Sequence, residues 1–455
     1  MTPLDGTLII YQAKSVNEFE NYMQSILKEA YPAFQKALQQ PDYKAIHVNN
    51  QKDPEMTIPA HFSLQPHPYV KTGFYFDKET LPLGRYAYHD AGLYYIQEPS
   101  AMLVAELAEG KPGMKVLDLC AAPGGKATRI ALQVGKEGLL VANDINANRA
   151  RILSENIERF GLANTIVLCS DPQALVKRFE NYFDIVILDA PCSGEGMFRK
   201  LDQAVETWSV QKVDECAHLQ SQLIEQAYAM LKPGGTLMYS TCTYEIKENE
   251  DQVRQALERF DLTLDPLEIR PGMAEGIDLP GTLRLYPHLF KGEGHFIAKM
   301  IKGKQAVSTP VARPQTSRLT KEQSQLVADF YAQHLKIPLP KTIIANQNHL
   351  YAIRPDFPDL KGLRVLRQGL YLGECKKKRF EPSHSLALSL DKEEVRSYYD
   401  YPYDAIEIKK YLHGETLEGN HDNGFALICV DGFSLGFAKE VNHVLKNYYP
   451  KGLRK

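Results

Sequence analysis

Two cysteines are the residues of this sequence best suited to covalent chemistry. Cys192 lies in the segment Asp189-Ala190-Pro191-Cys192-Ser193-Gly194, and Cys242 lies in Ser240-Thr241-Cys242-Thr243. A thiolate that adds to C6 of a pyrimidine prepares C5 to accept a methyl group, and a base must then remove the C5 proton. Asp189 lies at the right edge to act as an acid near N3, which predicts a raised pKa for its carboxyl group. The two segments therefore point to methyl transfer onto a pyrimidine.

A glycine-rich loop supplies a candidate cofactor site. It begins where an apolar run at 115–119 ends, and a helix-permissive segment at 127–132 follows it. Its residues are Cys120, Ala121, Ala122, Pro123, Gly124, Gly125 and Lys126. In a doubly wound sheet such a loop lies at the carboxyl edge of the first strand, and its glycines allow a ligand to approach the backbone closely. We therefore expect a nucleotide-like ligand here.

Two acidic residues narrow the choice of ligand. Asp144 ends the second expected strand, where a carboxylate can bind ribose hydroxyls, and Asp171 ends the third, where it can bind an adenine amino group. Neither the dinucleotide motif G-x-G-x-x-G nor the phosphate loop G-x-x-x-x-G-K-[ST] is present. The combination favours S-adenosylmethionine, a ligand with ribose but no phosphate. The alternative is an ordinary glycine-rich turn with solvated aspartates beyond it.

The positions of these segments follow from an alternation of strands and helices. Strands are expected at 115–119, 139–143, 165–169, 185–188 and 236–240, with helices notably at 147–160 and 211–231. Such alternation predicts an α/β fold with a mostly parallel, doubly wound sheet. The fourth and fifth strands are neighbours in this topology, so Cys192 and Cys242 should lie close together. We further expect Ser100 to cap a helix, residues 232–235 to form a sharp turn, and strands near 262–267 and 295–301 to complete the sheet.

The rest of the chain divides by composition. The 455 residues predict two to four domains. We expect an N-terminal α/β appendage at 1–90 with a helix at 14–38 interrupted near Pro32, a central domain at 91–302, a basic linker at 303–321, an intermediate domain at 322–388 and a final domain at 389–455. Asp431-Gly432 predicts a hairpin between strands at 425–430 and 433–439. Residues 361–379 hold seven basic residues against the single acid Glu374, which makes them the first candidate for RNA contact, and the linker is the second.

Other features exclude several classes of protein. The net charge is −3, so any RNA-binding surface must be a local patch. No apolar run approaches the roughly 18 residues of a membrane span, and residues 1–11 lack the pattern of a signal peptide. The seven cysteines include no C-x-x-C pair and suit a reducing cytoplasm, and a zinc site would need two further ligands. We expect a cytoplasmic protein without a metal, in which Cys169, Cys216, Cys375 and Cys429 are buried packing residues.

Three motifs, in this order, resemble those of the Sun-family RNA cytosine-C5 methyltransferases. They are the loop at 120–126, Asp189-Ala-Pro-Cys-Ser-Gly-Glu-Gly196 and Ser240-Thr-Cys-Thr243. The match spans about residues 90 to 302 and includes Tyr95-Ile-Gln-Glu98 and Gly292-Glu-Gly-His-Phe296. The C-terminal part, which ends in Asn447-Tyr-Tyr-Pro-Lys-Gly-Leu453, resembles the bacterial RsmF-type 16S rRNA methyltransferases.

The resemblance implies specific roles. It implies a class I Rossmann-like methyltransferase domain, a PUA-like β-barrel at 389–455, and RNA as partner, namely 16S rRNA or the small ribosomal subunit. It assigns the nucleophile to Cys242 and the release of product to Cys192. It assigns cofactor contacts to residues 120–126, Asp144, Asp171 and Asp189. The family often has a serine two residues after its Thr-Cys motif, where this sequence has Tyr244.

Two other classes of function stay open from the sequence. One is a methyltransferase that acts on a protein or a small molecule, which a requirement for folded RNA would exclude. The other is a non-catalytic RNA-binding or assembly factor that keeps the fold, although the intact cysteine pair argues against it. Covalent trapping of RNA by cysteine variants would distinguish both from an RNA methyltransferase.

Overall fold

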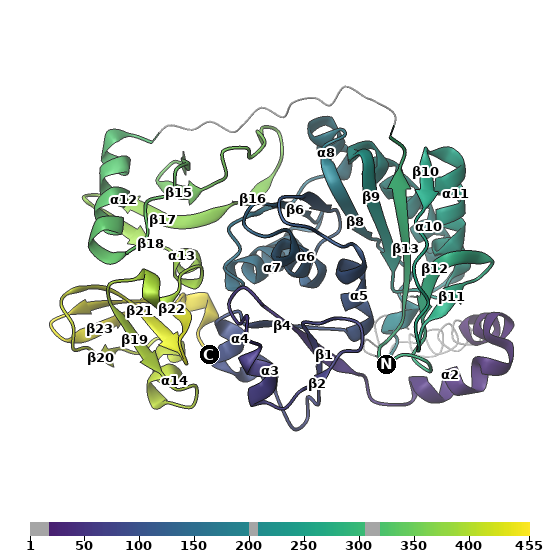
Figure 1. Ribbon diagram of the computed structural model, residues 1–455, viewed down its shortest axis with the longest axis horizontal. Coiled ribbons are helices and arrows are strands. Elements are labelled where there is room, and N and C mark those ends of the chain that lie inside the picture. Colours follow the sequence, from purple (N-terminus) through teal and green to yellow (C-terminus); the bar gives the residue numbers. More distant parts are fainter. Residues whose placement is uncertain (1–17, 200–207, 305–318) are drawn as a thin grey trace, which may run out of the picture.

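A large mixed sheet forms the centre of the molecule (Figure 1). The computed structural model describes residues 18–199, 208–304 and 319–455. Among them the large sheet has the strand order β11-β12-β13-β9-β8-β5-β6-β7-β16, and β10 pairs with β13. Its strands are β5 (Lys115–Asp118), β6 (Leu139–Asn143), β7 (Thr165–Leu168), β8 (Phe183–Asp189), β9 (Leu231–Thr241), β10 (Leu262–Leu264), β11 (Ala274–Gly276), β12 (Leu279–Leu285), β13 (His295–Lys302) and β16 (Val365–Gln368). The run from β9 to β7 is parallel, which confirms the doubly wound fold expected from the sequence.

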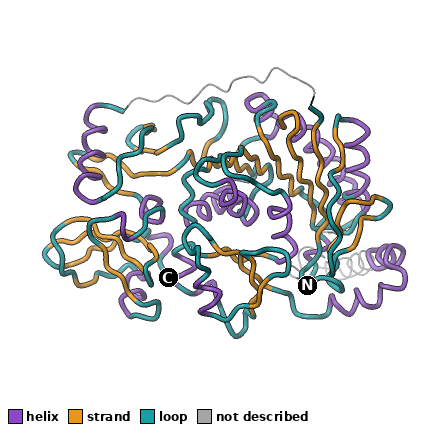
Figure 2. The backbone as a smooth tube through the Cα atoms, in the orientation of Figure 1, coloured by secondary structure: helices purple, strands orange, loops and turns teal. Residues whose placement is uncertain are grey.

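Helices cover both faces of this sheet, and each face has its own core (Figure 2). Alternate residues of a strand belong to different cores, as Val116 and Leu117 of β5 do, because successive side chains point to opposite faces. The first core packs against α5 (Pro99–Leu107), α6 (Gly125–Val134) and α7 (Ala147–Arg159). The second packs against α8 (Pro172–Phe179), α10 (Val210–Met230) and α11 (Glu250–Arg259).

Two local expectations are wrong. Glu98, and not Ser100, caps α5: its carboxylate accepts hydrogen bonds from the backbone N–H groups of Ser100 and Ala101. Residues 232–235 do not form a separate turn, because β9 begins at Leu231 directly after α10. The pairing of β9 with β8 shifts register between Phe183 and Ile185, and Gly234 has a positive φ of 76°, so the irregularity stays inside the sheet.

The N-terminal region is a small α/β unit. Residues 18–27 are helical, and the helix is interrupted at η1 (Lys28–Ala30), just before Pro32, as expected. A four-stranded antiparallel sheet follows in the order β2-β3-β1-β4. The remaining elements are α2 (Tyr31–Leu38), β1 (Lys44–Val48), α3 (Thr57–His61), β2 (Gln65–Pro66), β3 (Gly73–Phe76), η2 (Leu83–Arg85), α4 (Ala87–Asp90) and β4 (Tyr94–Gln97).

The C-terminal region contains two further sheets. One has the order β14-β15-β17-β18, and the other, which belongs to the expected PUA-like part, has the order β19-β21-β22-β23-β20. The hairpin at Asp431-Gly432 is present, with both residues at positive φ. The elements are α12 (Lys321–His334), β14 (Ile343–Asn346), β15 (His349–Ala352), β17 (Leu370–Lys376), β18 (Arg379–Pro382), α13 (His384–Leu388), η5 (Lys392–Glu394), β19 (Tyr398–Tyr401), α14 (Ile406–His413), β20 (Leu417–Glu418), β21 (Gly424–Val430), β22 (Phe433–Val441), β23 (Val444–Asn447) and η6 (Lys451–Leu453). Most of the expected basic linker, residues 305–318, lies outside the described residues.

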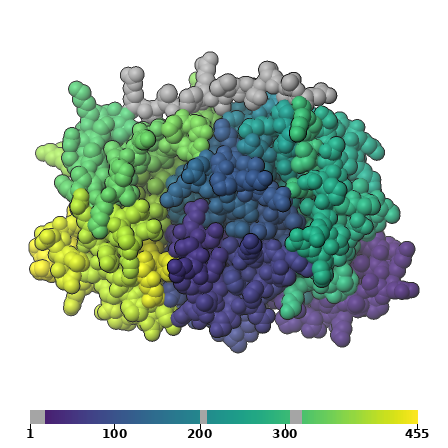
Figure 3. Space-filling view, viewed as in Figure 1, coloured from purple at the N-terminus to yellow at the C-terminus, as the bar shows by residue number. Residues whose placement is uncertain are grey.

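The N-terminal sheet packs against the last part of the chain. Residues of the N-terminal sheet, such as Ile46 and Val48, share one hydrophobic core with Ile408 and Leu435 of the C-terminal part. The Tyr88 hydroxyl donates to Asp431 Oδ2 at 2.6 Å across this contact. Figure 3 shows the two regions in contact along the lower edge of the molecule. The N-terminal sheet is therefore tied to the C-terminal part by a shared core and a hydrogen bond.

The basic stretch at 361–379 has a structural role that its composition does not reveal. It contains β16, which extends the large sheet by pairing antiparallel to β7. Arg367 is buried and bonds to Glu158 Oε2 at 2.5 Å and Ser385 Oγ at 3.0 Å. Lys376 and Arg379 both pair with Glu381. Three of the seven cations therefore have carboxylate partners, and contact of RNA with this stretch stays a prediction.

Removal of Arg367 should weaken the joint between β16 and α7. We predict that Arg367→Ala destabilises the protein by about 2 kcal/mol, less than for a fully buried pair because Glu158 is partly exposed. The measurement is the shift in the urea midpoint. Arg379→Ala is the matched control from the same stretch, and its exposed pair should contribute less than about 1 kcal/mol. Equal shifts for both variants would contradict this role for Arg367.

Candidate active site

The pairing of β8 with β9 brings the two cysteines together. Asp189, the last residue of β8, lies opposite Ser240 in the parallel register. The loops that leave these paired positions place Cys192 Sγ and Cys242 Sγ 3.3 Å apart. Gly196 closes the first loop against the second, since its N–H donates to the Cys242 carbonyl oxygen at 2.8 Å. A Cβ at position 196 would lie 2.8 Å from that oxygen, so the close approach requires glycine.

The two thiols of the pair have different surroundings. The hydrogen bond with Cys242 and burial both raise the pKa of Cys192 well above its usual range. Cys192 is therefore the member of the pair that keeps its proton. Burial, with Asp118 nearby, also raises the pKa of Cys120 strongly, so this third cysteine stays a neutral thiol. The role of nucleophile, which the resemblance assigns to Cys242, stays a prediction.

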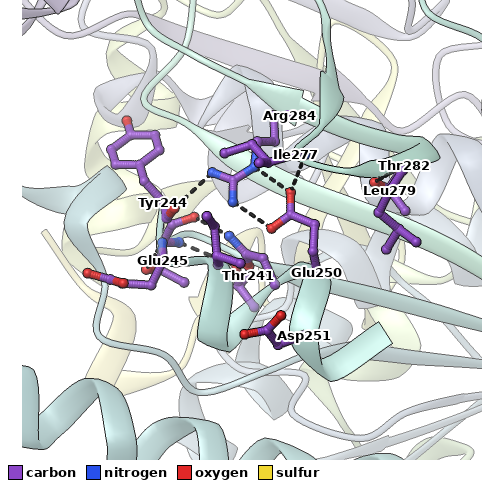
Figure 4. Close-up of polar contacts among 12 residues, drawn as sticks. Thr241, Tyr244, Glu245, Glu250, Asp251, Ile277, Leu279, Thr282 and Arg284 are labelled. Carbon is purple, nitrogen blue, oxygen red and sulfur yellow. Dashed lines mark hydrogen bonds and ion pairs between the residues drawn. The ribbon is translucent and has the colours of Figure 1, made fainter. Parts of the chain in front are cut away.

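A buried ion pair anchors the segment that follows Cys242 (Figure 4). Arg284 on β12 bonds to both carboxylate oxygens of Glu250 at 2.6 Å, and its Nη1 donates to the Tyr244 carbonyl oxygen at 2.8 Å. Both side chains of the pair are at most 2% exposed. The Ile277 N–H donates to the same carboxylate at 2.9 Å. A planar guanidinium that makes these bonds fixes the backbone at Tyr244, two residues beyond the cysteine.

The glycine-rich loop lies beside the cysteine pair. Gly124 has a φ of 118° and precedes α6, whose first turn contains Lys126. The loop is held from α7, because Arg149 donates to the Ala122 carbonyl at 2.7 Å and Asn156 donates to the Pro123 carbonyl at 2.9 Å. Lys126 Nζ reaches across to Asp189 Oδ2 at 2.8 Å. This bond connects the candidate cofactor loop to the segment that carries Cys192.

Charge keeps Lys126 and Asp189 ionised. Burial lowers the pKa of the Lys126 ammonium, but Asp189, Asp118 and Cys242 raise it above its usual value. Burial raises the pKa of Asp189, but Lys126 and His295 outweigh it and hold the pKa below its usual range. The expected raised pKa at Asp189 is therefore wrong for this arrangement. The physical reason is the Lys126 cation, which stabilises the carboxylate.

Four carboxylates lie at or just beyond the ends of four neighbouring strands. They are Asp118 on β5, Asp144 after β6, Asp171 after β7 and Asp189 on β8. Asp144 accepts from the Asn146 N–H and lies 3.3 Å from Arg149. Asp171 is exposed and caps α8 through the Gln173 N–H. Such acceptors suit a ligand with hydroxyl and amino donors and a positive charge, which fits S-adenosylmethionine better than a phosphate-bearing nucleotide.

Asp118 is a residue that the sequence reasoning missed. It is buried, and neither carboxylate oxygen has a hydrogen-bond partner among the described residues. Burial raises its pKa to about 8, against the opposing effect of Lys126. An acid in the otherwise apolar run at 115–119 was the available signal. His295 was also without a role, and it lies 3.4 Å from Asp189 Oδ1.

Family models match this chain along most of its length. The model of the 16S rRNA methyltransferase RsmB/F family matches residues 105–301. Three RsmF models match the N-terminal domain at 16–99, the first C-terminal domain at 329–390 and the PUA domain at 399–455. Ribosomal RNA small subunit methyltransferase F of Erwinia tasmaniensis is 33% identical over 96% of both chains. The chain belongs to the RsmF family of methyltransferases.

Other members and solved structures agree with this family. The protein of the same name from Vibrio vulnificus is 33% identical over 91% of this chain and 92% of its own. A methyltransferase homologue from Pyrococcus horikoshii is 29% identical with a TM-score of 0.55, over 66% of this chain and all of the other. NSun6 from the same organism, solved with SFG, is 25% identical with a TM-score of 0.56, over 63% of this chain and 98% of that one. These matches confirm the Rossmann-like methyltransferase fold.

The described residues hold neither a metal-binding cluster nor a membrane-spanning helix. They contain no cluster of His, Cys, Asp or Glu able to hold a metal ion. None of their helices is both long and apolar enough to span a bilayer. All seven cysteines fall in the described ranges and none is in a disulfide.

The effect of Lys126 on Asp189 predicts how the stability of a Lys126 variant depends on pH. In Lys126→Met, the main influence that opposes burial is gone and His295 alone still lowers the pKa of Asp189. We therefore expect this pKa to rise, so that the folded protein loses stability as pH rises through it. In wild type the stability contributed by Asp189 changes with pH in the opposite direction. Because the pKa of Asp189 is lowered in the fold, its carboxylate stabilises the protein at pH values above the usual pKa of an aspartate. We predict a loss of about 2 kcal/mol at pH 8 and a smaller loss at pH 5, allowing for partial exposure of Asp189.

Melting temperatures of wild type and variant at the two pH values give the measurement. Lys126→Arg keeps the positive charge and should remove most of the pH dependence. A loss in Lys126→Met that is the same at both pH values would contradict electrostatic control of Asp189.

Proposed function

We propose that this chain transfers a methyl group from S-adenosylmethionine to C5 of a cytosine in 16S rRNA through a covalent bond between Cys242 and C6. The observation that carries the proposal is the 3.3 Å separation of the Cys192 and Cys242 sulfurs beside Lys126 and Asp189. The family models and relatives support rRNA as the substrate class, because their descriptions name 16S rRNA or the small ribosomal subunit.

The chemistry begins at Cys242. Its thiolate, within reach of the Lys126 charge, forms the bond to C6, and the electrons of the C5–C6 double bond move to make C5 nucleophilic. S-adenosylmethionine supplies the methyl group that C5 takes. A base then removes the C5 proton, the C5–C6 double bond re-forms, and Cys242 leaves as a thiolate. Cys192, which keeps its proton and contacts Cys242, assists this release.

Asp189 acts on the pyrimidine ring as a carboxylate. Because Lys126 holds it ionised, it cannot bring its own proton to N3. It can share a proton that N3 already holds, or accept a hydrogen bond from the amino group of cytosine. Ser240 Oγ, which donates to Asp189 Oδ1 at 2.7 Å, fixes the orientation of the carboxylate.

The remaining candidate residues would hold the cofactor. We assign the backbone of residues 120–126 to its methionine end, Asp144 to the ribose hydroxyls and Asp171 to the adenine amino group. Asp118, buried without a partner among the described residues, is an additional acceptor for a positively charged ligand group. The domain limits given under Sequence analysis, the role of residues 1–90 in RNA binding and a cytoplasmic location remain predictions.

Covalent trapping tests the assignment of the two cysteines. We predict that Cys192→Ala accumulates a protein–RNA adduct because product release slows, whereas Cys242→Ala forms none and loses activity by at least about 100-fold. Adducts are measured on denaturing gels after incubation with rRNA and S-adenosylmethionine, and 5-methylcytosine is mapped by bisulfite sequencing. Cys375→Ala, in the C-terminal part, is the control and should behave as wild type.

The reverse pattern would exchange the roles of the two cysteines. Activity retained in both variants without any adduct would remove the thiolate mechanism. Methylation of a protein or small molecule without rRNA would favour the alternative substrate classes, and RNA binding without methylation would favour an assembly factor.

A further inference from the structure

A fully buried cluster of acids lies beneath the two cysteine loops. Glu195 follows Cys192 on η3 (Glu195–Met197), and Glu248 follows Cys242 on η4 (Ile246–Glu248). Ser193 lies between them, with its Oγ 2.8 Å from Glu195 Oε1 and in hydrogen-bond contact with Glu248 Oε1. All three side chains are at most 1% exposed. The cluster is therefore a direct link between the loop of Cys192 and the loop of Cys242.

The two contacts of Ser193 Oγ need two protons if both are hydrogen bonds. Two carboxylates and one hydroxyl have only one. The Ser193 hydroxyl has a single proton, so it can donate to only one of the two carboxylate oxygens that contact it. The Thr243 hydroxyl lies 3.1 Å from Ser193 Oγ and can donate to it. It therefore does not supply the missing proton between Ser193 and the two glutamates. One of the two glutamates must be a carboxylic acid for both contacts to be hydrogen bonds.

The N–H donors identify which glutamate holds the proton. Both oxygens of Glu195 face N–H groups: Trp208 Nε1 contacts Oε1, and the Tyr244 N–H is 3.3 Å from Oε2. Glu248 Oε2 accepts from the Ser193 N–H at 3.1 Å and from Gln220 Nε2 at 2.7 Å. Among the residues that the structure describes, Glu248 Oε1 has one other donor besides Ser193 Oγ, the Ser193 N–H at 3.4 Å. Of the two carboxylate oxygens that contact Ser193 Oγ, Glu195 Oε1 also accepts from the Trp208 N–H, so the proton between Ser193 and the two acids fits on Glu248 Oε1.

We propose that Glu248 holds a proton and donates it in a hydrogen bond to the Ser193 hydroxyl, which donates its own proton to the Glu195 carboxylate. These two hydrogen bonds lock the two cysteine loops together and keep the two sulfurs in contact. Glu248, Ser193 and Glu195 are positioning residues, because they act on the reaction through Cys192 and Cys242. The effect of this lock on catalysis rests on the proposed function. The position of the proton on Glu248 is independent of that function.

The surroundings of Glu248 agree with this arrangement. Burial and then Glu195 raise the pKa of Glu248 to about 7. The other titratable groups that face it are Cys192 in its loop, Cys216 on α10, Tyr239 on β9 and Glu245 on its own segment. Each of these side chains is either neutral or negatively charged. None of them therefore stabilises the ionised form of Glu248.

The lock predicts opposite effects for two isosteric substitutions. In Glu248→Gln the amide NH2 can donate to Ser193 while the amide oxygen accepts from Ser193 N–H and Gln220, which copies the acid. In Glu195→Gln any orientation points an NH2 group at an N–H donor. We expect the methylation rate of Glu195→Gln to fall at least about tenfold below that of Glu248→Gln, the effect of one mismatched buried group. Glu225→Gln, an exposed position on α10, is the matched control.

Adduct trapping separates loss of position from loss of folding. We expect Glu195→Gln to displace Cys192 while Cys242 stays intact. The variant should then accumulate a protein–RNA adduct, as Cys192→Ala does. An unfolded variant cannot form this adduct. The reverse order of the two rates would place the proton on Glu195 and overturn the proposal. Equal rates would also overturn it, because the two glutamates would then be equivalent.

A thermal measurement needs only Glu248→Gln and no substrate. Because the pKa of Glu248 is raised in the fold, wild type must release this proton as pH rises through about 7 and loses stability there. Glu248→Gln has no such proton, so its melting temperature relative to wild type should rise between about pH 5 and pH 8. A constant difference would overturn the proposal. If Cys242→Ala still forms an adduct, the proposed function fails while this thermal result stands.

Discussion

The parallel pairing of β8 with β9 is the constraint on which the site depends. Its register sets Asp189 opposite Ser240, and both cysteine loops begin within three residues of that pair. The two sulfurs are 50 residues apart in sequence and 3.3 Å apart in space because two strands end together. Gly196 and the buried Arg284–Glu250 pair then hold the loops that the strands have positioned. Strand register thus produces a juxtaposition that loops alone could not maintain.

Charge organises the other half of the site. Lys126 lies among Asp118, Asp189 and Cys242, and it is the cation that keeps Asp189 ionised despite burial. The same residue belongs to the loop expected to hold the cofactor. The candidate cofactor loop and the candidate nucleophile Cys242 are therefore linked through one ammonium group. Burial, in contrast, raises the pKa of Asp118 to about 8, so that this side chain favours its neutral form. The two aspartates at the same sheet edge differ in protonation because only Asp189 has a short bond to the lysine.

The sequence predicted those parts of the fold that depend on local pattern. The five parallel strands, the flanking helices and the Asp431-Gly432 hairpin follow from apolar periodicity and turn chemistry, and the topology then predicted the nearness of Cys192 and Cys242. The role of β16 could not be predicted, because this short strand lies inside a stretch rich in basic residues and pairs with β7 through a contact distant in sequence. The charge state of Asp189 was mistaken for the same reason: it depends on Lys126, 63 residues earlier. The buried glutamates 195, 248 and 250 lie in polar segments that read as exposed.

The most direct test of the central claim uses wild-type protein and rRNA that contains 5-fluorocytosine. Fluorine at C5 cannot be removed as a proton, so the bond between the thiol and C6 should persist after methyl transfer. The account predicts an adduct that forms only with S-adenosylmethionine and that mass spectrometry assigns to the peptide containing Cys242, linked to a base that carries both fluorine and a methyl group. An adduct on Cys192, or methylation of the natural rRNA with no adduct on the fluorinated one, would contradict the account.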